Sequence, residues 1–141
     1  MTGVQTCALP ISLAAHPEKR HIVTTKVEHN AVLHYCRHLQ KNGYRVTELS
    51  VDRLGRINLN ELQSSLSDDT AIVSIMYANN ETGVVFPIEH IGQMVKSRGI
   101  VFHTDAVQAV GKIPLNLSTL PVDFLSLSGH KLHAPKGVGV L

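Results

Sequence analysis

Lys131 is the residue of this chain that is best placed for covalent chemistry. It belongs to the sequence Ser-Gly-His-Lys of residues 128–131. A lysine that presents its amine to an aldehyde must be held by a rigid element, with small neighbours that let a cofactor approach. Residues 124–128 alternate large apolar and small side chains over the length of a strand, and Gly129 permits a sharp change of direction. We therefore expect Lys131 just beyond the end of a strand.

A second pair of candidate residues follows the apolar run of residues 100–102. Asp105 and Gln108 lie three positions apart in this segment. An acid at the end of a buried parallel strand can keep a ring nitrogen protonated, and an amide three residues later can reach the edge of the same ring. An acid for a pyridinium nitrogen, together with Lys131 for an aldehyde, indicates a pyridoxal phosphate site.

The string from His103 to Gly139 resembles the cysteine desulfurases, which are pyridoxal phosphate enzymes of the class V aminotransferase group. The resemblance covers residues 16–141 and is greatest to the nitrogen-fixation branch, followed by the housekeeping iron–sulfur branch and the selenocysteine lyases. It is dense, so it carries more weight than any single motif. It implies an α/β fold, namely part of the large pyridoxal phosphate-binding domain of a fold type I (aspartate aminotransferase-like) enzyme, with a mostly parallel sheet and flanking helices.

The resemblance also implies a role for each residue near the lysine. Lys131 would bond to the cofactor aldehyde and move a proton after its release, and Asp105 would keep the pyridine nitrogen protonated. Ser128 and His130 would bind the cofactor phosphate. Gln108 would hold the phenolic oxygen of the cofactor. Lys131 is thus expected to be both a catalytic and a cofactor-binding residue.

Two residues from earlier in the chain complete the site that the resemblance implies. Asn80, the second asparagine of residues 78–83 (ANNETG), would also hold the phenolic oxygen. His29, in residues 28–32 (EHNAV), would stack on the pyridine ring and move protons. A neutral imidazole offers a flat face to a cationic ring and titrates near neutral pH. Without the resemblance, His29 would be interpreted as a capping or surface histidine and Asn80 as an ordinary turn residue.

For the whole enzyme, the resemblance implies conversion of L-cysteine to L-alanine, with the sulfur transferred as an enzyme persulfide for iron–sulfur cluster assembly. The implied partners are L-cysteine, a second copy of the chain in a homodimer, and an iron–sulfur scaffold or another sulfur acceptor protein. The acceptor cysteine, the arginine that binds the substrate carboxylate and a Gly-Thr phosphate loop of the family have no match within the 141 residues. We therefore expect the chain to be an incomplete part of the enzyme, inactive alone. Selenocysteine lyase and a non-catalytic cofactor-binding remnant stay open as alternatives.

The composition is that of one ordinary folded domain. Of the residues, 43% are hydrophobic and 17% are charged, which is typical of globular proteins. A net charge of +2, scattered basic residues and only 4% aromatic residues argue against a nucleic-acid-binding surface. No apolar run approaches the roughly 20 residues that span a bilayer. We expect a cytoplasmic protein without nucleic-acid or membrane partners.

The cysteines and histidines do not form a recognisable metal or disulfide pattern. Cys7 and Cys36 have neither a paired framework nor a metal-ligand spacing, and Cys36 is expected to be a small buried residue. His34 and His38 have the spacing that places two imidazoles on one helix face, but no third ligand accompanies them. We expect no metal bound to protein side chains.

Residues 1–12 are interpreted as foreign to the rest of the chain. Residues 2–11 correspond to one reading frame of a common sequencing adapter, and no resemblance to the family is expected there. A signal peptide is the alternative, but the segment lacks a basic start and its apolar stretch is broken. The expected domain is therefore residues 13–141, a partial large domain without the small C-terminal domain.

The remaining sequence alternates strands and helices. Strands are predicted at residues 21–25, 44–51, 71–77, 100–105 and 124–128, and helices at residues 28–42, 58–66 and 87–98. This alternation predicts a parallel sheet with right-handed crossovers. Residues 71–77 are nearly continuously apolar and should form a central strand. A further strand is expected to begin within residues 137–141.

Overall fold

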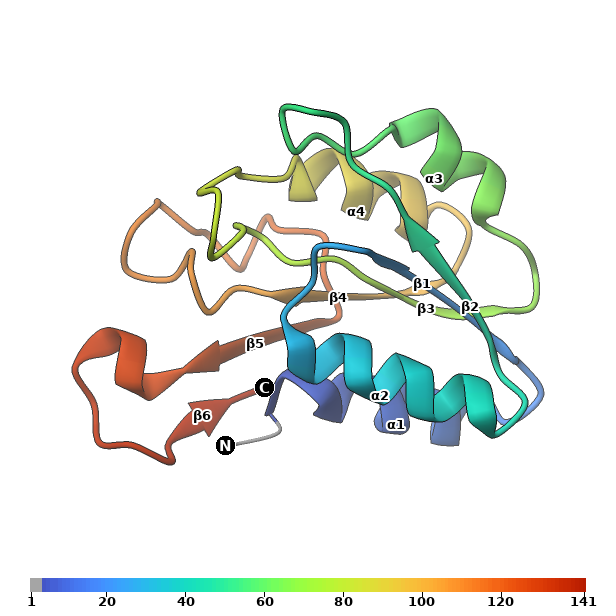
Figure 1. Cartoon of the computed structure of the whole chain (residues 1–141), viewed down its shortest axis with the longest axis horizontal. Coiled ribbons are helices and arrows are strands. Elements are labelled where there is room, and N and C mark those ends of the chain that lie inside the picture. Colours follow the sequence, from blue (N-terminus) through green and yellow to red (C-terminus); the bar gives the residue numbers. More distant parts are fainter. Residues whose placement is uncertain (1–3) are drawn as a thin grey trace.

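The computed structural model describes residues 4–141, with side chains from Cys7 onward. Within these residues, a six-stranded sheet has the order β2-β1-β3-β4-β5-β6 (Figure 1). The strands are β1 (His21–Thr25), β2 (Arg45–Leu49), β3 (Thr70–Ser74), β4 (Val101–Asp105), β5 (Phe124–Ser128) and β6 (Gly139–Val140). Strands β1 to β5 pair in parallel, whereas β6 is antiparallel to β5. The predicted parallel α/β sheet, with β3 in its interior, is confirmed.

Two helices cover each face of the sheet. Helices α1 (Val4–Ala15) and α2 (Asn30–Lys41) lie on one face, and α3 (Leu59–Ser65) and α4 (Ile88–Lys96) lie on the other (Figure 1). A short 3₁₀ helix (Gly129–Leu132) follows β5. No helix in the described part of the chain is long and apolar enough to cross a membrane.

The apolar core lies in two layers, one on each side of the sheet. Ile22 and Ile72 pack with α1 and α2, whereas the adjacent residues Val23 and Val73 pack with the cluster that includes α3 and α4. Successive side chains of a strand point to opposite faces, so a strand covered on both sides needs apolar residues at consecutive positions. This explains why β1 and β3 are completely buried and carry consecutive apolar residues at their centres.

Helix α1 includes part of the segment that we interpret as foreign. Ala8 and Leu9 are completely buried against the layer that contains Ile72, although Pro10 lies inside the helix. Small and apolar residues at these positions therefore fit the space against the sheet next to α2. The interpretation of residues 1–12 as foreign stays a prediction, and residues 1–3 lie outside the described part of the chain.

The ends of several elements differ by a few residues from the predicted ones. Helix α2 begins at Asn30 because His29 caps it, and Asn58 caps α3 as predicted, accepting hydrogen bonds from the amides of residues 60 and 61. Strand β3 ends at Ser74, but residues 75–77 stay beside β4, since the Ile75 and Tyr77 amides donate to carbonyls of β4. The segment after β3 is thus held in the sheet almost to the loop that contains Asn80.

Two buried histidines connect neighbouring strands. Each ring nitrogen of His21 on β1 and His103 on β4 lies within hydrogen-bond distance of a hydroxyl oxygen on an adjacent strand. The pairs are His21 Nδ1 with Thr70 (2.8 Å), His21 Nε2 with Thr47 (2.8 Å), His103 Nδ1 with Ser74 (2.8 Å) and His103 Nε2 with Ser126 (3.1 Å). Burial lowers the pKa of each histidine to about 4, so both are neutral at neutral pH.

Replacing His103 by Gln tests this bridge through the pH dependence of stability. At neutral pH the variant should lose about 2 kcal/mol of unfolding free energy, because one hydroxyl loses its partner in the core. The folded pKa of His103 lies below the ordinary value of 6.5, so the unfolded chain binds more protons in acid. The stability that His103 contributes is therefore present above about pH 6.5 and lost toward about pH 4, by up to about 3 kcal/mol. Because this loss exceeds the gap at neutral pH, the gap between parent and variant should close and then reverse in sign toward about pH 4.

Urea unfolding of the chain and of the variant across this pH range measures the gap. His34→Gln is the matched control, because His34 is exposed on α2 and its replacement should leave the pH dependence unchanged. A gap between parent and His103→Gln that stays constant down to about pH 4 would contradict the neutral bridge.

Candidate functional site

The predicted site residues lie beyond the ends of four adjacent parallel strands. His29 follows β1, Asn80 follows β3, Asp105 ends β4 and Ser128 ends β5, and these strands are neighbours in the sheet. The same edge of the sheet receives all four segments, at the left in Figure 1. Open α/β sheets bind ligands at this edge. We call this group the carboxyl-edge site, and it also includes Gln108, His130 and Lys131.

Asp105 is the most deeply buried acid of the carboxyl-edge site. Its side chain is 2% exposed, and its Oδ1 accepts a hydrogen bond of 3.0 Å from the Val107 amide. Its own carbonyl accepts from the Tyr77 amide, and the next residue, Ala106, donates to the Ser126 carbonyl. These bonds tie the acid to both neighbouring strands. A buried carboxylate needs donors to stay ionised, so this acid suits a ligand that brings an N–H group.

Ser128, His130 and Lys131 lie where the chain leaves β5. Ser128 is buried, and its Oγ lies 2.7 Å from His130 Nδ1. Lys131 is exposed on the 3₁₀ helix, so the prediction that it lies just beyond a strand end is confirmed. Glycine is favoured at position 129, because a Cβ there would lie only 3.1 Å from both the Val138 carbonyl oxygen and Cβ of Ala134.

Gln108 and Asn80 are oriented by neighbouring residues. Lys112 donates to the amide oxygen of Gln108 (2.6 Å), which leaves the amide nitrogen as the end that can donate to a ligand. Asn80 is exposed in the loop after β3. The buried Asn79 holds this loop, since its Oδ1 accepts from the Glu81 and Thr82 amides at 3.0 Å and 2.9 Å.

His29 is the N-cap of α2. Its Nδ1 accepts a hydrogen bond of 3.2 Å from the Ala31 amide, so the neutral ring carries its proton on Nε2. The ring is half-buried at the start of the helix. The capping interpretation of His29 is therefore confirmed, and its stacking on a pyridine ring stays a prediction.

Glu28 and Asn79 contribute to the site in ways that the sequence did not indicate. Glu28 is 5% exposed, and its Oε1 accepts from the Thr25 hydroxyl (2.8 Å) and the Met76 amide (2.9 Å). Asn79 donates to the Val27 carbonyl at 3.0 Å. Both side chains join the segment after β1 to the segment after β3. In the sequence, the position of Glu28 directly before His29 was the one feature that could have pointed to it. Asn79 could be interpreted only as a turn residue.

The thiol of Cys36 is completely buried on α2, as predicted. Burial raises its pKa to about 12, so it stays protonated and unreactive at neutral pH. Among the described residues, no group of three or more His, Cys, Asp or Glu side chains is arranged to hold a metal ion.

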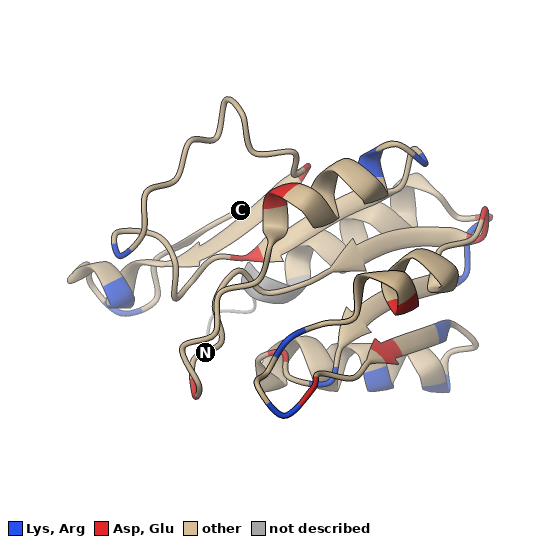
Figure 2. Cartoon of the chain, turned by 90° about the horizontal axis from the view of Figure 1, so that it is seen from above, with Lys and Arg blue, Asp and Glu red and all other residues tan. Residues whose placement is uncertain are grey.

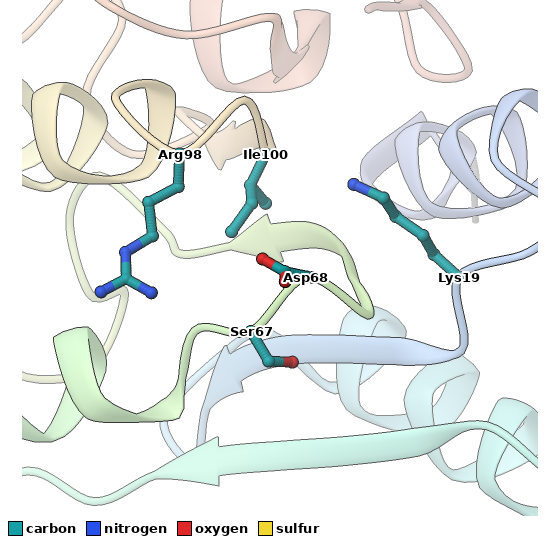
Figure 3. A pocket seen from close by; sticks show the side chains of 5 residues that line it. All are labelled: Lys19, Ser67, Asp68, Arg98 and Ile100. Carbon is teal, nitrogen blue, oxygen red and sulfur yellow. The ribbon is translucent and has the colours of Figure 1, made fainter.

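Charged residues are spread over the described surface, and one pocket lies apart from the carboxyl-edge site. Figure 2 shows that basic and acidic residues are interspersed over the elements. Figure 3 shows a pocket lined by Lys19, Ser67, Asp68, Arg98 and Ile100. These residues precede β1, β3 and β4, so the pocket lies at the amino ends of the strands. Its charges are mixed, and none of the predicted site residues lines it.

Comparison with protein families identifies the group to which this fold belongs. The family model described as aminotransferase class-V matches residues 2–141. The matched range includes residues 2–12, where no resemblance was expected. Members of this family depend on pyridoxal phosphate.

Curated relatives are similar over nearly the whole chain. Cysteine desulfurase 2 of Trichormus variabilis is 64% identical over 140 residues, which cover 99% of this chain and 35% of the relative. The cysteine desulfurase NifS of Azotobacter vinelandii is 53% identical over the same shares. The cysteine desulfurase IscS of Salmonella newport is 54% identical over 122 residues, 86% of this chain and 30% of the relative.

Solved structures agree in fold. A NifS-like protein has a TM-score of 0.91 and 41% identity. The match covers 97% of this chain and 38% of the chain of the NifS-like protein. A structure of SspA in complex with cysteine has a TM-score of 0.89 and 36% identity over 98% of this chain and 41% of its own. The chain thus spans about a third of the length of the curated relatives that it matches. The match of the family model over residues 2–141 shows that the chain belongs to the class V aminotransferase family.

Proposed function

We propose that this chain is a cofactor-binding part of a cysteine desulfurase. The enzyme would convert L-cysteine to L-alanine, and a thiol of the enzyme would take up the sulfur as a persulfide for iron–sulfur cluster assembly. The observation that carries the proposal is the combination of the buried acid Asp105 at the end of β4 with Lys131 just past the end of the adjacent strand β5. The names of the relatives and the complex of SspA with cysteine support cysteine as the substrate.

The residues of the carboxyl-edge site fit pyridoxal phosphate in their chemistry. The Asp105 carboxylate suits the N–H group of a pyridinium ring. The Ser128 hydroxyl and the imidazole of His130, 2.7 Å apart, suit phosphate oxygens. The amides of Gln108 and Asn80 suit a phenolic oxygen. Each kind of polar group on the cofactor therefore has a matching group in this chain.

Bound at this edge, pyridoxal phosphate would supply an electrophilic aldehyde and an electron-withdrawing ring. Asp105, held by the Val107 amide, would keep a proton on the ring nitrogen. Lys131 would hold the cofactor through its amine, and its free amine would take the proton from the substrate Cα. His29 presents Nε2 for proton exchange, since its Nδ1 is engaged in the helix cap.

The remaining features of the proposal concern assembly and surroundings. The partners are L-cysteine, a second copy in a homodimer and an iron–sulfur scaffold or another sulfur acceptor protein. A cytoplasmic location suits the free thiol of the buried Cys36, because reducing compartments keep cysteines unpaired. Since the chain spans about a third of its relatives, residues for sulfur acceptance belong to the rest of the enzyme.

A chimeric enzyme tests the role of Lys131. Residues 13–141 replace the matching segment of the 64% identical cysteine desulfurase 2 of Trichormus variabilis. Borohydride reduction should attach a pyridoxyl group to Lys131, which peptide mass spectrometry identifies. Lys131→Ala should abolish this adduct and lower the release of sulfide from cysteine by about a thousandfold or more, because the amine that bonds to the aldehyde and moves the proton is lost.

Lys136→Ala is the matched control, because Lys136 is an exposed lysine of the same loop. It should keep both the adduct and the activity. An adduct at Lys112 or Lys136 in the parent chimera would overturn the assignment of Lys131.

The role of Asp105 can be separated from cofactor attachment. Asp105→Asn keeps an oxygen that can accept from the Val107 amide but removes the negative charge. The chimera with this change should still form the Lys131 adduct, whereas exchange of the substrate Cα proton with D₂O, followed by NMR, should slow by about a hundredfold or more. Asp68→Asn, at the opposite edge of the sheet, is the control. Unchanged exchange in Asp105→Asn would remove the argument for a protonated ring nitrogen.

A further inference from the structure

The carboxyl group of Glu28 is buried between the segments that follow β1 and β3. One oxygen, Oε1, accepts both hydrogen bonds of the group, from the Thr25 hydroxyl and the Met76 amide. The other oxygen, Oε2, is buried without a hydrogen-bond partner among the described residues. An ionised carboxylate would leave part of its charge unsolvated there, whereas a neutral acid keeps its acceptor oxygen and loses the charge.

The electrostatic surroundings of Glu28 also favour the neutral acid. Burial raises the pKa of Glu28 to about 8, although the hydrogen bonds from the Met76 amide and the Thr25 hydroxyl act in the opposite direction. The negative charge of Asp105 on β4 adds a smaller upward effect. From α2, the buried thiol of Cys36 interacts with it electrostatically. The exposed Lys26 directs its ammonium to the Ser50 hydroxyl (3.0 Å), and His29 is engaged at Nδ1 in the helix cap.

We propose that Glu28 is a positioning residue for His29: as an uncharged acid it fastens the segment after β1 to the segment after β3. His29 follows Glu28 directly and begins α2 at this point. The Met76 amide that Glu28 binds lies three residues before Asn79, whose side chain binds the Val27 carbonyl. Two cross-links, one at the Val27 carbonyl and one at the Glu28 side chain, therefore set the place from which the His29 ring extends. This inference rests on the proposed function, because it assigns Glu28 to the cofactor site.

Because Glu28 is a buried acid, its positioning role depends on pH. The folded pKa of Glu28 is raised above its ordinary value, so the folded chain holds a proton there that the unfolded chain gives up. The arrangement is fully stable in acid and loses stability as the pH rises to about 8. Above that pH, Glu28 would be a buried anion near Asp105. This favours an arrangement in which Glu28 reaches water and releases the Met76 amide.

Variants of the holoenzyme chimera test the role. Glu28→Gln keeps an acceptor oxygen and cannot ionise, whereas Glu28→Met fills similar space without an acceptor. Glu61→Gln, an exposed acid of α3, is the control. The measurements are the dissociation constant of pyridoxal phosphate from about pH 6.5 to about pH 9.5 and the hydrogen exchange of the Met76 amide.

We expect Glu28→Gln to match the parent at neutral pH and to keep its affinity above about pH 8, where the parent and Glu61→Gln weaken by about tenfold. Glu28→Met should weaken binding by about tenfold at every pH and expose the Met76 amide to exchange. If Glu28 acts through His29, Glu28→Met in a His29→Ala background should cost little more than His29→Ala alone.

Three results would overturn the inference. These are an equal loss of affinity with pH in Glu28→Gln and the parent, an unchanged Met76 exchange rate in Glu28→Met, or additive effects of the Glu28 and His29 changes. Failure of the proposed function has a different signature, namely no adduct at Lys131 in the parent chimera. In that case the exchange of the Met76 amide still decides whether Glu28 fastens the two segments.

Discussion

The parallel pairing of β3, β4 and β5 is the constraint on which the candidate site depends. It brings residues that are far apart in the sequence to one edge of the sheet, and the His103 ring bonds to both neighbouring strands from the interior of that pairing. The Tyr77 amide donates to the Asp105 carbonyl, and the Ala106 amide donates to the Ser126 carbonyl, so the pairing continues into the loops. Asp105 is consequently fixed by backbone on both sides before any ligand binds.

The polar groups inside the domain are arranged so that most carry no charge. His21 and His103 are neutral because they are buried, and each bonds to two hydroxyl groups. Glu28 is neutral because burial raises its pKa. Near Asp105 at the carboxyl edge, the neutral Glu28 then adds no second negative charge. Specific chemistry at one acid thus depends on the neutrality of its neighbours.

Much of the fold could be predicted from the sequence, because its signals are local. The nearly continuous apolar run at 71–77 predicted a central, buried strand, and the types of Asp105 and Lys131 at predicted strand ends singled these two residues out. The contact of Glu28 with the Met76 amide joins residues 48 positions apart, and no local pattern reveals it. The antiparallel direction of β6 likewise depends on the turn after the 3₁₀ helix. Roles for His29, Asn80 and His130 come from the resemblance alone.

The neutral state of Glu28 means that folding of this domain is also a proton-binding reaction. In the unfolded chain at neutral pH this acid is ionised, and on folding it takes up about one proton, since its pKa moves from 4.5 to about 8. His21 and His103 together release a smaller amount, because only a minor fraction of each is protonated in the unfolded chain near neutrality. The buffer supplies the difference. The heat measured on folding therefore includes the ionisation heat of that buffer, and it will vary from one buffer to another at the same pH.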